Sequence, residues 1–263
     1  MKKNLILLLP TILFCSCSTF YYKTNAVNTP MFTHGGQAHL SAGVGFGENY
    51  GQSSSFADIQ ASYSPIDHVG ILFNYSANSY TNADYSSNGT TSNKYITNSD
   101  LTEGAIGGYI ATTGRYKLVN ELYAGAGHGN VYSFANLGFN RAFLQYGIGM
   151  RSRYIDAIFN MRFSDLTFTS FDPKGLTNSD LLRYKLIDYN GRRIDDGSAF
   201  FLEPSFTVRG GYRFIKAQLQ LVFCAGPSVH WGYSNSRYTA GIYFALEDLV
   251  QAIRAANNRR DEQ

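Results

Sequence analysis

The chain has 263 residues, of which 44% are hydrophobic, 16% charged and 15% aromatic, and its formal charge at pH 7 is +3. This composition excludes a disordered tail, a collagen and a disulfide scaffold, and no long run of one charge predicts a nucleic-acid partner. After residue 16, no stretch approaches the roughly 18 apolar residues that a spanning helix needs, so no helical membrane protein is expected. The 20 Tyr, 19 Phe and 26 Gly favour strands and tight turns.

The first residues have the layout of a secretion signal. Lys2 and Lys3 precede an apolar run over 5–14, and the small residue Ser16 stands directly before Cys17. This layout resembles a bacterial lipoprotein leader, which implies that the chain is cut before Cys17 and that this cysteine carries palmitate or another acyl chain.

Residues 1–16 are therefore predicted to be a lipoprotein signal peptide, and residues 17–35 a periplasmic tether. Plain secretion is the alternative, because Phe14 stands where such leaders usually have Leu. After cleavage only Cys17 and Cys224 remain, so an acylated Cys17 leaves no intrachain disulfide.

From about residue 36 the hydropathy has a period of two, which is typical of strands with one apolar face. In the first segment Leu40 and Val44 alternate with Ser41 and Gly43. Pro204 fits the pattern least, because proline removes a ladder donor, and a bulge is expected there. The predicted strands cover 38–47, 57–64, 69–76, 101–111, 116–127, 141–150, 155–163, 202–209, 216–223 and 237–244.

The links between these strands alternate between short and long. Short links fall at 65–68, 112–115, 151–153 and 211–214, and long ones at 48–56, 79–100, 128–136, 165–197 and 226–236. This asymmetry is typical of outer-membrane barrels, which have short periplasmic turns and long outer loops. The sequence predicts an all-β fold, a ten-stranded antiparallel up-and-down transmembrane beta-barrel over 36–244.

Both ends of an even-stranded barrel lie on one side, so both termini are expected in the periplasm. A lipid on Cys17 would then enter the inner leaflet of the outer membrane. The alternative is a soluble, lipid-tethered barrel with its apolar face inside. Against it, the polar face carries many Gly and few Lys, unlike a soluble surface, and the apolar face carries no charge.

The polar face of the strands predicts a lumen lined by charges of both signs. A barrel of this size has little room beyond its own side chains, so we expect an ion-pair network that fills the interior. A narrow channel or a small-solute site is the alternative. The residues expected in this network are Asp58, Glu103, Glu121, Arg141, Arg162, Glu203 and Arg237 in the upper half, and Asp156 with Arg209 lower down.

Few residues suggest catalysis. His230 and Ser234 weakly resemble the pair that barrel-type lipid hydrolases place near the membrane edge, but their spacing is four rather than two and no carboxylate is indicated as a partner. The histidines near the predicted turns are too scattered for a metal site. No catalytic, metal or cofactor site is therefore expected.

After Phe244 the hydropathy follows helical spacing. Leu246, Leu249 and Ile253 share one face, and Glu247 lies in the first turn, as the helix dipole favours. Residues 245–263 are predicted to be a periplasmic amphipathic helix and tail. It either caps the barrel mouth or binds a partner or a membrane surface.

Four short pieces support the barrel and its location. They are 58–61 (DIQA), 103–109 (EGAIGGY), 121–129 (ELYAGAGHG) and 141–149 (RAFLQYGIG), within the first six predicted strands. In this order they resemble a group of uncharacterised outer-membrane barrel lipoproteins common in Bacteroidetes-type bacteria. The resemblance implies a fold and a location but no activity.

The leading hypothesis is a non-enzymatic, lipid-anchored outer-membrane barrel with a structural or accessory role in a cell-envelope complex. Outer-membrane lipid is the expected partner, together with an envelope protein that binds the outer loops or the C-terminal helix. The runner-up is a small outer-membrane hydrolase acting on lipid or peptide.

Overall fold

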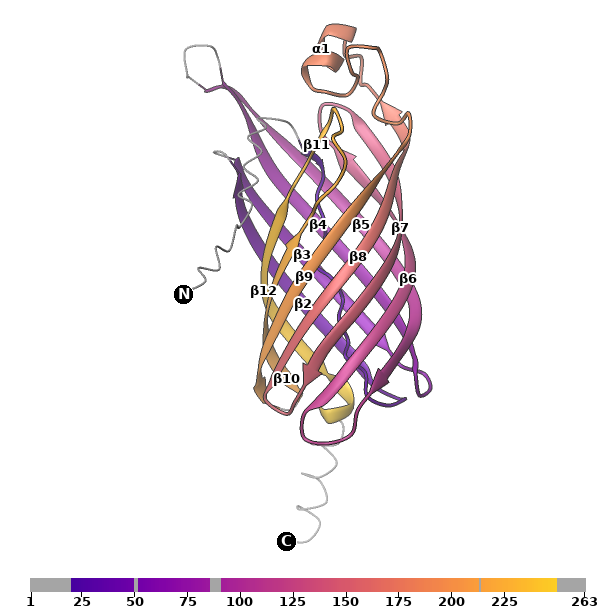
Figure 1. Ribbon diagram of the computed structural model, residues 1–263. Coiled ribbons are helices and arrows are strands. Elements are labelled where there is room, and N and C mark those ends of the chain that lie inside the picture. The colour runs from indigo at the N-terminus through magenta and orange to yellow at the C-terminus, as the bar shows by residue number, and fades with distance from the viewer. Residues whose placement is uncertain (1–19, 50–51, 86–90, 213, 250–263) are drawn as a thin grey trace, which may run out of the picture.

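Ten antiparallel strands form one closed barrel (Figure 1). The computed structural model describes residues 20–49, 52–85, 91–212 and 214–249. The predicted signal peptide, Cys17 and residues 250–263 lie outside this part of the chain. The barrel strands are β2 (Ala38–Asn49), β3 (Gln52–Tyr63), β4 (Val69–Tyr85), β5 (Thr91–Ala111), β6 (Lys117–Tyr132), β7 (Asn136–Arg151), β8 (Ile155–Asp172), β9 (Ser198–Tyr212), β10 (Ile215–Phe223) and β12 (Ser236–Ala245).

Each barrel strand pairs with its neighbour in sequence, and β12 closes the barrel on β2. A second, two-stranded sheet joins β1 (Phe20–Tyr22) in parallel to β11 (Gly232–Tyr233). Two short helices complete the described fold, α1 (Asn178–Arg183) and α2 at 246–249. The predicted all-β, ten-stranded barrel with a short C-terminal helix is confirmed. No helix among the described residues is long and apolar enough to cross a membrane.

The barrel has two unlike ends. At the turn-side end, the strands are joined by the short links 64–68, 112–116, 152–154 and 213–214, and α2 follows β12 there. At the loop-side end, 173–197 and 224–235 form long connections, and α1 lies in the first of them (Figure 1).

Four of the predicted long links, 48–56, 79–100, 128–136 and 165–197, are shorter in the structure. β4 and β5 pair from Val69↔Gly108 up to Tyr85↔Thr91, so most of the predicted loop 79–100 is strand. β6 and β7 likewise continue to Tyr132↔Asn136. In the β4 and β5 extensions Ser, Thr and Asn occupy both faces, so the hydropathy does not alternate there, although the backbones still pair.

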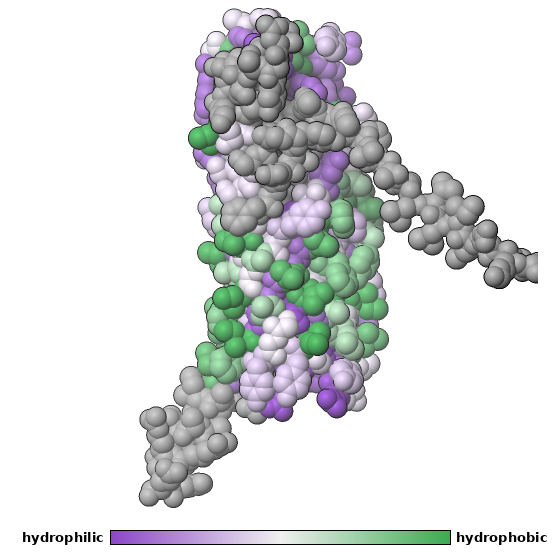
Figure 2. Space-filling view, turned by 90° about the vertical axis from the view of Figure 1, so that its left-hand side faces the viewer, coloured by the Kyte–Doolittle hydropathy of each residue, from purple (hydrophilic) through white to green (hydrophobic). Residues whose placement is uncertain are grey.

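The predicted faces of the strands are confirmed by burial. Apolar side chains point outward over the turn-side part of the barrel, and hydrophilic ones gather toward both ends (Figure 2). A tyrosine stands exposed beside each short link, namely Tyr63, Tyr116, Tyr154 and Tyr212. The exposed apolar residues include Leu40, Val44, Ile59, Ile71, Phe73, Ile106, Leu118, Leu122, Leu144, Met150, Phe159, Phe163, Phe206, Val208, Leu219, Leu221 and Ile242.

Pro204 does not cause a bulge. The β9–β10 pairing runs from Ile215↔Tyr212 to Val222↔Ser205 and resumes in the same register at the bridge Leu202↔Ala225. Pro204 lies in the gap between these pairs, opposite Phe223, the last residue of β10, so the ladder donor that proline lacks is missing only at the end of that strand.

The segment 20–33 runs through the lumen, and this corrects the prediction of a tether outside the barrel. Almost all of these residues are buried, and Val27, Met31 and Phe32 have no exposed surface. Phe20 lies at the loop-side end, where its carbonyl accepts a hydrogen bond from the Tyr80 hydroxyl. We call residues 20–33 the lumen segment.

The two ends of the described chain therefore lie at opposite ends of the barrel, and not together as predicted. The chain enters at Phe20, descends through the lumen, and turns at 34–37 into β2 at the turn-side end. There Ser64 of the neighbouring turn donates its N–H to the Gln37 carbonyl, and Gly35 donates to Asp67 at 2.5 Å.

Candidate functional site: the lumen network

All nine residues predicted for the lumen network are buried inside the barrel. Their strands place them there because every second side chain of a barrel strand points inward. Among the residues that the structure describes, five acidic and five basic side chains are buried, so the formal charges of these ten balance. The acidic ones are Asp58, Glu103, Glu121, Asp156 and Glu203, and the basic ones are Arg141, Arg162, Arg209, Lys216 and Arg237.

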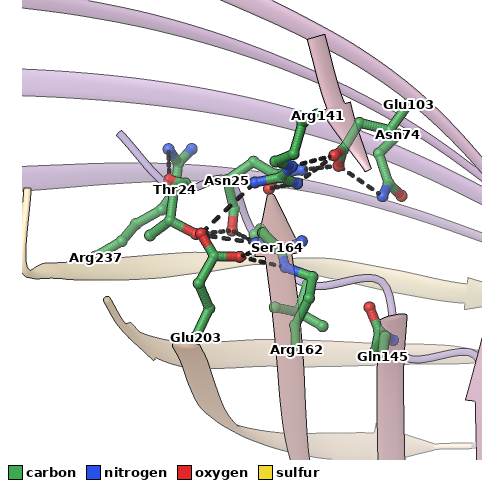
Figure 3. A network of polar contacts seen from close by, with 12 residues as sticks. Thr24, Asn25, Asn74, Glu103, Arg141, Gln145, Arg162, Ser164, Glu203 and Arg237 are labelled. Atoms are coloured by element: carbon green, nitrogen blue, oxygen red, sulfur yellow. Dashed lines mark hydrogen bonds and ion pairs between the residues drawn. The ribbon is translucent and has the colours of Figure 1, made fainter. Parts of the chain in front are cut away.

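Arg141 joins the wall to the lumen segment (Figure 3). Its Nε donates to Oε1 of Glu103 at 2.7 Å, and its Nη2 donates to Oδ1 of Asn25 at 2.8 Å. Asn25 in turn donates from Nδ2 to the other Glu103 oxygen at 2.6 Å. The three side chains form a closed triangle in which the carboxylate and the guanidinium both bind one amide of the lumen segment.

Glu203 is the second point at which wall and segment meet. It accepts from Nε of Arg162 at 2.5 Å and from the Tyr22 hydroxyl at 2.6 Å, while Ser164 donates to it at 2.9 Å. Nη1 of Arg141 lies 3.6 Å from Oε1 of Glu203, the oxygen that accepts from Tyr22. A buried carboxylate with this many donors has no unmet hydrogen-bonding capacity that would recruit a ligand.

Arg237 on β12 forms the third point. Its Nη2 donates to Asp58 at 2.5 Å, and its Nη1 donates to Asn78 at 2.7 Å and to the Thr24 carbonyl at 3.0 Å. Arg237 thus binds two wall strands, β3 and β4, and also the lumen segment.

Glutamines bind the backbone of the lumen segment below these arginines. Gln220 donates to the carbonyl of Val27 at 2.8 Å and accepts its N–H at 2.7 Å. Gln60 donates to the Ala26 carbonyl at 2.9 Å, and Gln145 donates to the Asn28 carbonyl at 2.8 Å. The segment has no strand partner here, and side chains supply the partners that a buried backbone requires.

The lower lumen contains Asp156 and Arg209, but these two side chains do not pair with each other. Asp156 pairs with Lys216 at 2.7 Å. Arg209 donates instead to the carbonyl and hydroxyl oxygens of Thr29, each at 2.7 Å, and to Gln218 at 2.7 Å. Thr29 of the lumen segment lies beside Arg209 and supplies these two acceptors.

Glu121 also departs from the prediction. Within the described part of the chain it forms no ion pair, and it accepts the backbone N–H of Met31 at 3.1 Å. Nearby, Arg151 donates to the Met31 carbonyl at 2.9 Å. The N–H and the carbonyl of Met31 are thus both bound by side chains of the barrel wall.

Glu247 of α2 closes the turn-side mouth. It accepts from Gln37 at 2.9 Å, lies 3.0 Å from Nε2 of His39, and lies 3.4 Å from Arg151. Burial favours the neutral acid, but the His39 hydrogen bond and the Arg151 charge outweigh it and lower the pKa of Glu247 to about 2. The start of this helix therefore caps the barrel mouth, which is one of the two roles predicted for it.

The lumen segment fits the wall closely. A Cβ added to Gly149 would lie 2.8 Å from the Met31 methyl group, and one added to Gly70 would lie 3.1 Å from the Phe32 ring. A void beside Ala26 and Gln60 measures about 10 Å³, no more than one water molecule needs. At these positions the barrel wall holds the lumen segment closely in place.

The loop-side end is covered by a second packed cluster. Leu181, Leu186 and Ile194 of the long connection pack with Tyr21, Phe201 and Trp231. A capping box at Thr177 and Asp180 starts α1, and Tyr21 donates to the Tyr184 carbonyl at 2.8 Å. The first residues of the lumen segment are therefore clamped under an ordered loop.

The weak catalytic pair is not assembled. Ser234 donates to the Ser236 carbonyl at 3.1 Å, and among the described residues no hydrogen bond joins it to His230. Cys224 is buried and packs in the loop-side cluster. In the part of the chain that the structure describes, no three His, Cys, Asp or Glu residues come together as metal ligands would.

No protein-family model and no curated protein matches this chain. The geometry of the lumen is therefore the basis for a functional conclusion.

Proposed function

We propose that the chain is a lipid-anchored outer-membrane β-barrel whose own N-terminal segment fills the lumen, and that it has a structural or accessory role in the envelope. The outer surface supports the membrane placement. In a soluble barrel the apolar side chains would fill the interior, whereas here they are exposed and the charges are buried. Burying an apolar belt of this kind in lipid is what stabilises outer-membrane barrels.

The ring of exposed tyrosines supports the orientation. Tyr63, Tyr116, Tyr154 and Tyr212 stand beside the short links, at the level where aromatic side chains of membrane proteins meet lipid headgroups. Short links face the periplasm in bacterial outer-membrane barrels, so the long connections would face outward.

The filled lumen carries the functional conclusion. Arg141, Arg162, Arg209 and Arg237 all bind the lumen segment, and no continuous water path is expected through such a plug. The barrel therefore serves as a rigid wall that presents its loop-side surface, where Tyr189 is 99% exposed, to an envelope partner.

Three measurements test this proposal. The folded barrel should migrate differently on a gel before and after heating, and wild-type protein should incorporate labelled palmitate that Cys17→Ala lacks. Cys17→Ala protein should still require detergent, because the exposed belt alone demands lipid. Full solubility of this variant without detergent would overturn the membrane placement.

The accessory role has its own test. Capture of the full chain from membranes in a mild detergent should recover a stoichiometric protein partner, and loss of that partner on Tyr189→Ala would assign it to the loop-side surface. Thr113→Ala, on an exposed turn at the opposite end, is the matched control. Recovery of the barrel alone, in every detergent that preserves its fold, would contradict the accessory role.

A further inference from the structure

We infer that an acyl chain on Cys17 enters the leaflet on the loop side of the barrel, which is the outer leaflet of the outer membrane, and so lies at the cell surface. This inference rests on the proposed lipid-anchored membrane barrel and adds the side from which it is anchored. It reverses the expectation that Cys17 lies with the C-terminus in the periplasm.

The position of Phe20 carries the inference. Its carbonyl accepts from Tyr80 on β4, and the segment that starts with it pairs with Gly232 and Tyr233 in the last loop-side connection. Tyr80 lies 80 − 69 = 11 residues along β4 from Val69 at the turn-side end. At ~3.3 Å per residue and a tilt of ~40°, Phe20 is roughly 28 Å above that end.

The chain between Cys17 and Phe20 is too short to return. Three residues span at most about 11 Å, well short of the roughly 28 Å to the turn-side end. An outer-membrane barrel has an apolar band ~25 Å tall, so Phe20 stands near its loop-side edge. An acyl chain attached three residues earlier reaches the loop-side leaflet and not the opposite one.

The lumen offers no second route. Below Phe20 the segment is bound on every side, since Arg141 and Glu203 bind Tyr22, Arg162 binds Thr24, and Gln220 binds Val27. A chain that doubled back to the periplasm would have to pass beside these contacts, where the interior is already packed. Withdrawal of the whole segment would break the same buried contacts.

Cysteine labelling in intact cells tests the inference. Thr19→Cys places a thiol between Cys17 and the lumen segment, and Cys224 is buried and should contribute little background. Asn190→Cys, exposed on the loop side, and Thr113→Cys, exposed in a turn, report the two sides. With a membrane-impermeant maleimide, we expect Thr19→Cys and Asn190→Cys to label in intact cells and Thr113→Cys only after the outer membrane is opened.

The controls separate the two possible failures. If Asn190→Cys labels in intact cells and Thr19→Cys does not, the inference is overturned while the spanning barrel stands. If Thr113→Cys labels as readily as Asn190→Cys in intact cells, the barrel does not span the membrane and the proposed function fails with it. Palmitate incorporation by Thr19→Cys, equal to that of wild type, verifies that the labelled protein is the lipidated form.

Discussion

Gln220 binds Val27 as one strand binds the next. Its amide accepts the N–H of Val27 at 2.7 Å and donates to the carbonyl of the same residue at 2.8 Å. Two such bonds per residue pair are the unit of an antiparallel ladder, and a side chain supplies them here. A peptide can thus be held in the lumen without joining the sheet that encloses it.

Gln220→Leu should lower the free energy of unfolding by about 2 to 4 kcal/mol, because two buried backbone groups of Val27 lose their partners. Urea unfolding of the purified barrel in detergent, followed by gel mobility, measures this. Leu219→Ala, one residue away and facing outward, should change stability by less than about 1 kcal/mol. Equal losses in the two variants would mean that the wall does not depend on the lumen segment.

Arg141→Leu should be more damaging, with a loss of about 3 to 5 kcal/mol, because it leaves the buried carboxylate of Glu103 without its guanidinium. Adding Glu103→Gln removes that charge and should restore part of the loss. The same unfolding assay, arranged as a double-mutant cycle, should give a coupling of about 0.5 to 3 kcal/mol. Strictly additive effects would show that the two side chains do not act as a pair.

A thiol placed in the lumen should be protected. Thr207 has no exposed surface, and its hydroxyl accepts from Gln220 at 2.6 Å. In the native barrel in detergent, Thr207→Cys should resist a small charged thiol reagent and react only after unfolding. Asn190→Cys on the loop surface provides the reactive control, and rapid modification of both would indicate a water-filled lumen.

Acid should loosen the turn-side mouth through Glu247. Its pKa falls from the ordinary 4.5 to about 2 in the folded protein, so its ionised form stabilises the fold fully above pH 4.5. That contribution is lost as the pH falls from about 4.5 to about 2. Over this window the wild type should lose more stability than Glu247→Gln in pH-dependent unfolding, and parallel curves would rule out this role.

Most of the wall could be predicted from the sequence. Alternation places Arg141, Arg162 and Glu203 on the lumen side because one face of each strand must meet an apolar surrounding, and burial confirms this placement. Alternation fails above Asn78 and Asn98, where both faces are polar. Strand pairing there depends on the backbone alone, which hydropathy does not report.

The lumen segment could not be predicted in the same way. Val27, Pro30 and Met31 follow neither a strand nor a helix period, and the partners of the segment in the barrel wall lie 33 to 213 positions away. One signal was present. Gln60, Gln145 and Gln220 point into a lumen whose charges can pair without them, and buried amides require partners that the wall alone does not supply.

Ion conductance in a planar bilayer tests most directly whether the N-terminal segment fills the lumen. The full chain should give no single-channel steps, because its lumen is closed from Phe20 to Thr33. A variant that lacks residues 20–33, and that retains heat-modifiable gel mobility as proof of a folded barrel, should conduct. Steady conductance by the full chain, or a folded deletion variant that stays closed, would contradict the account.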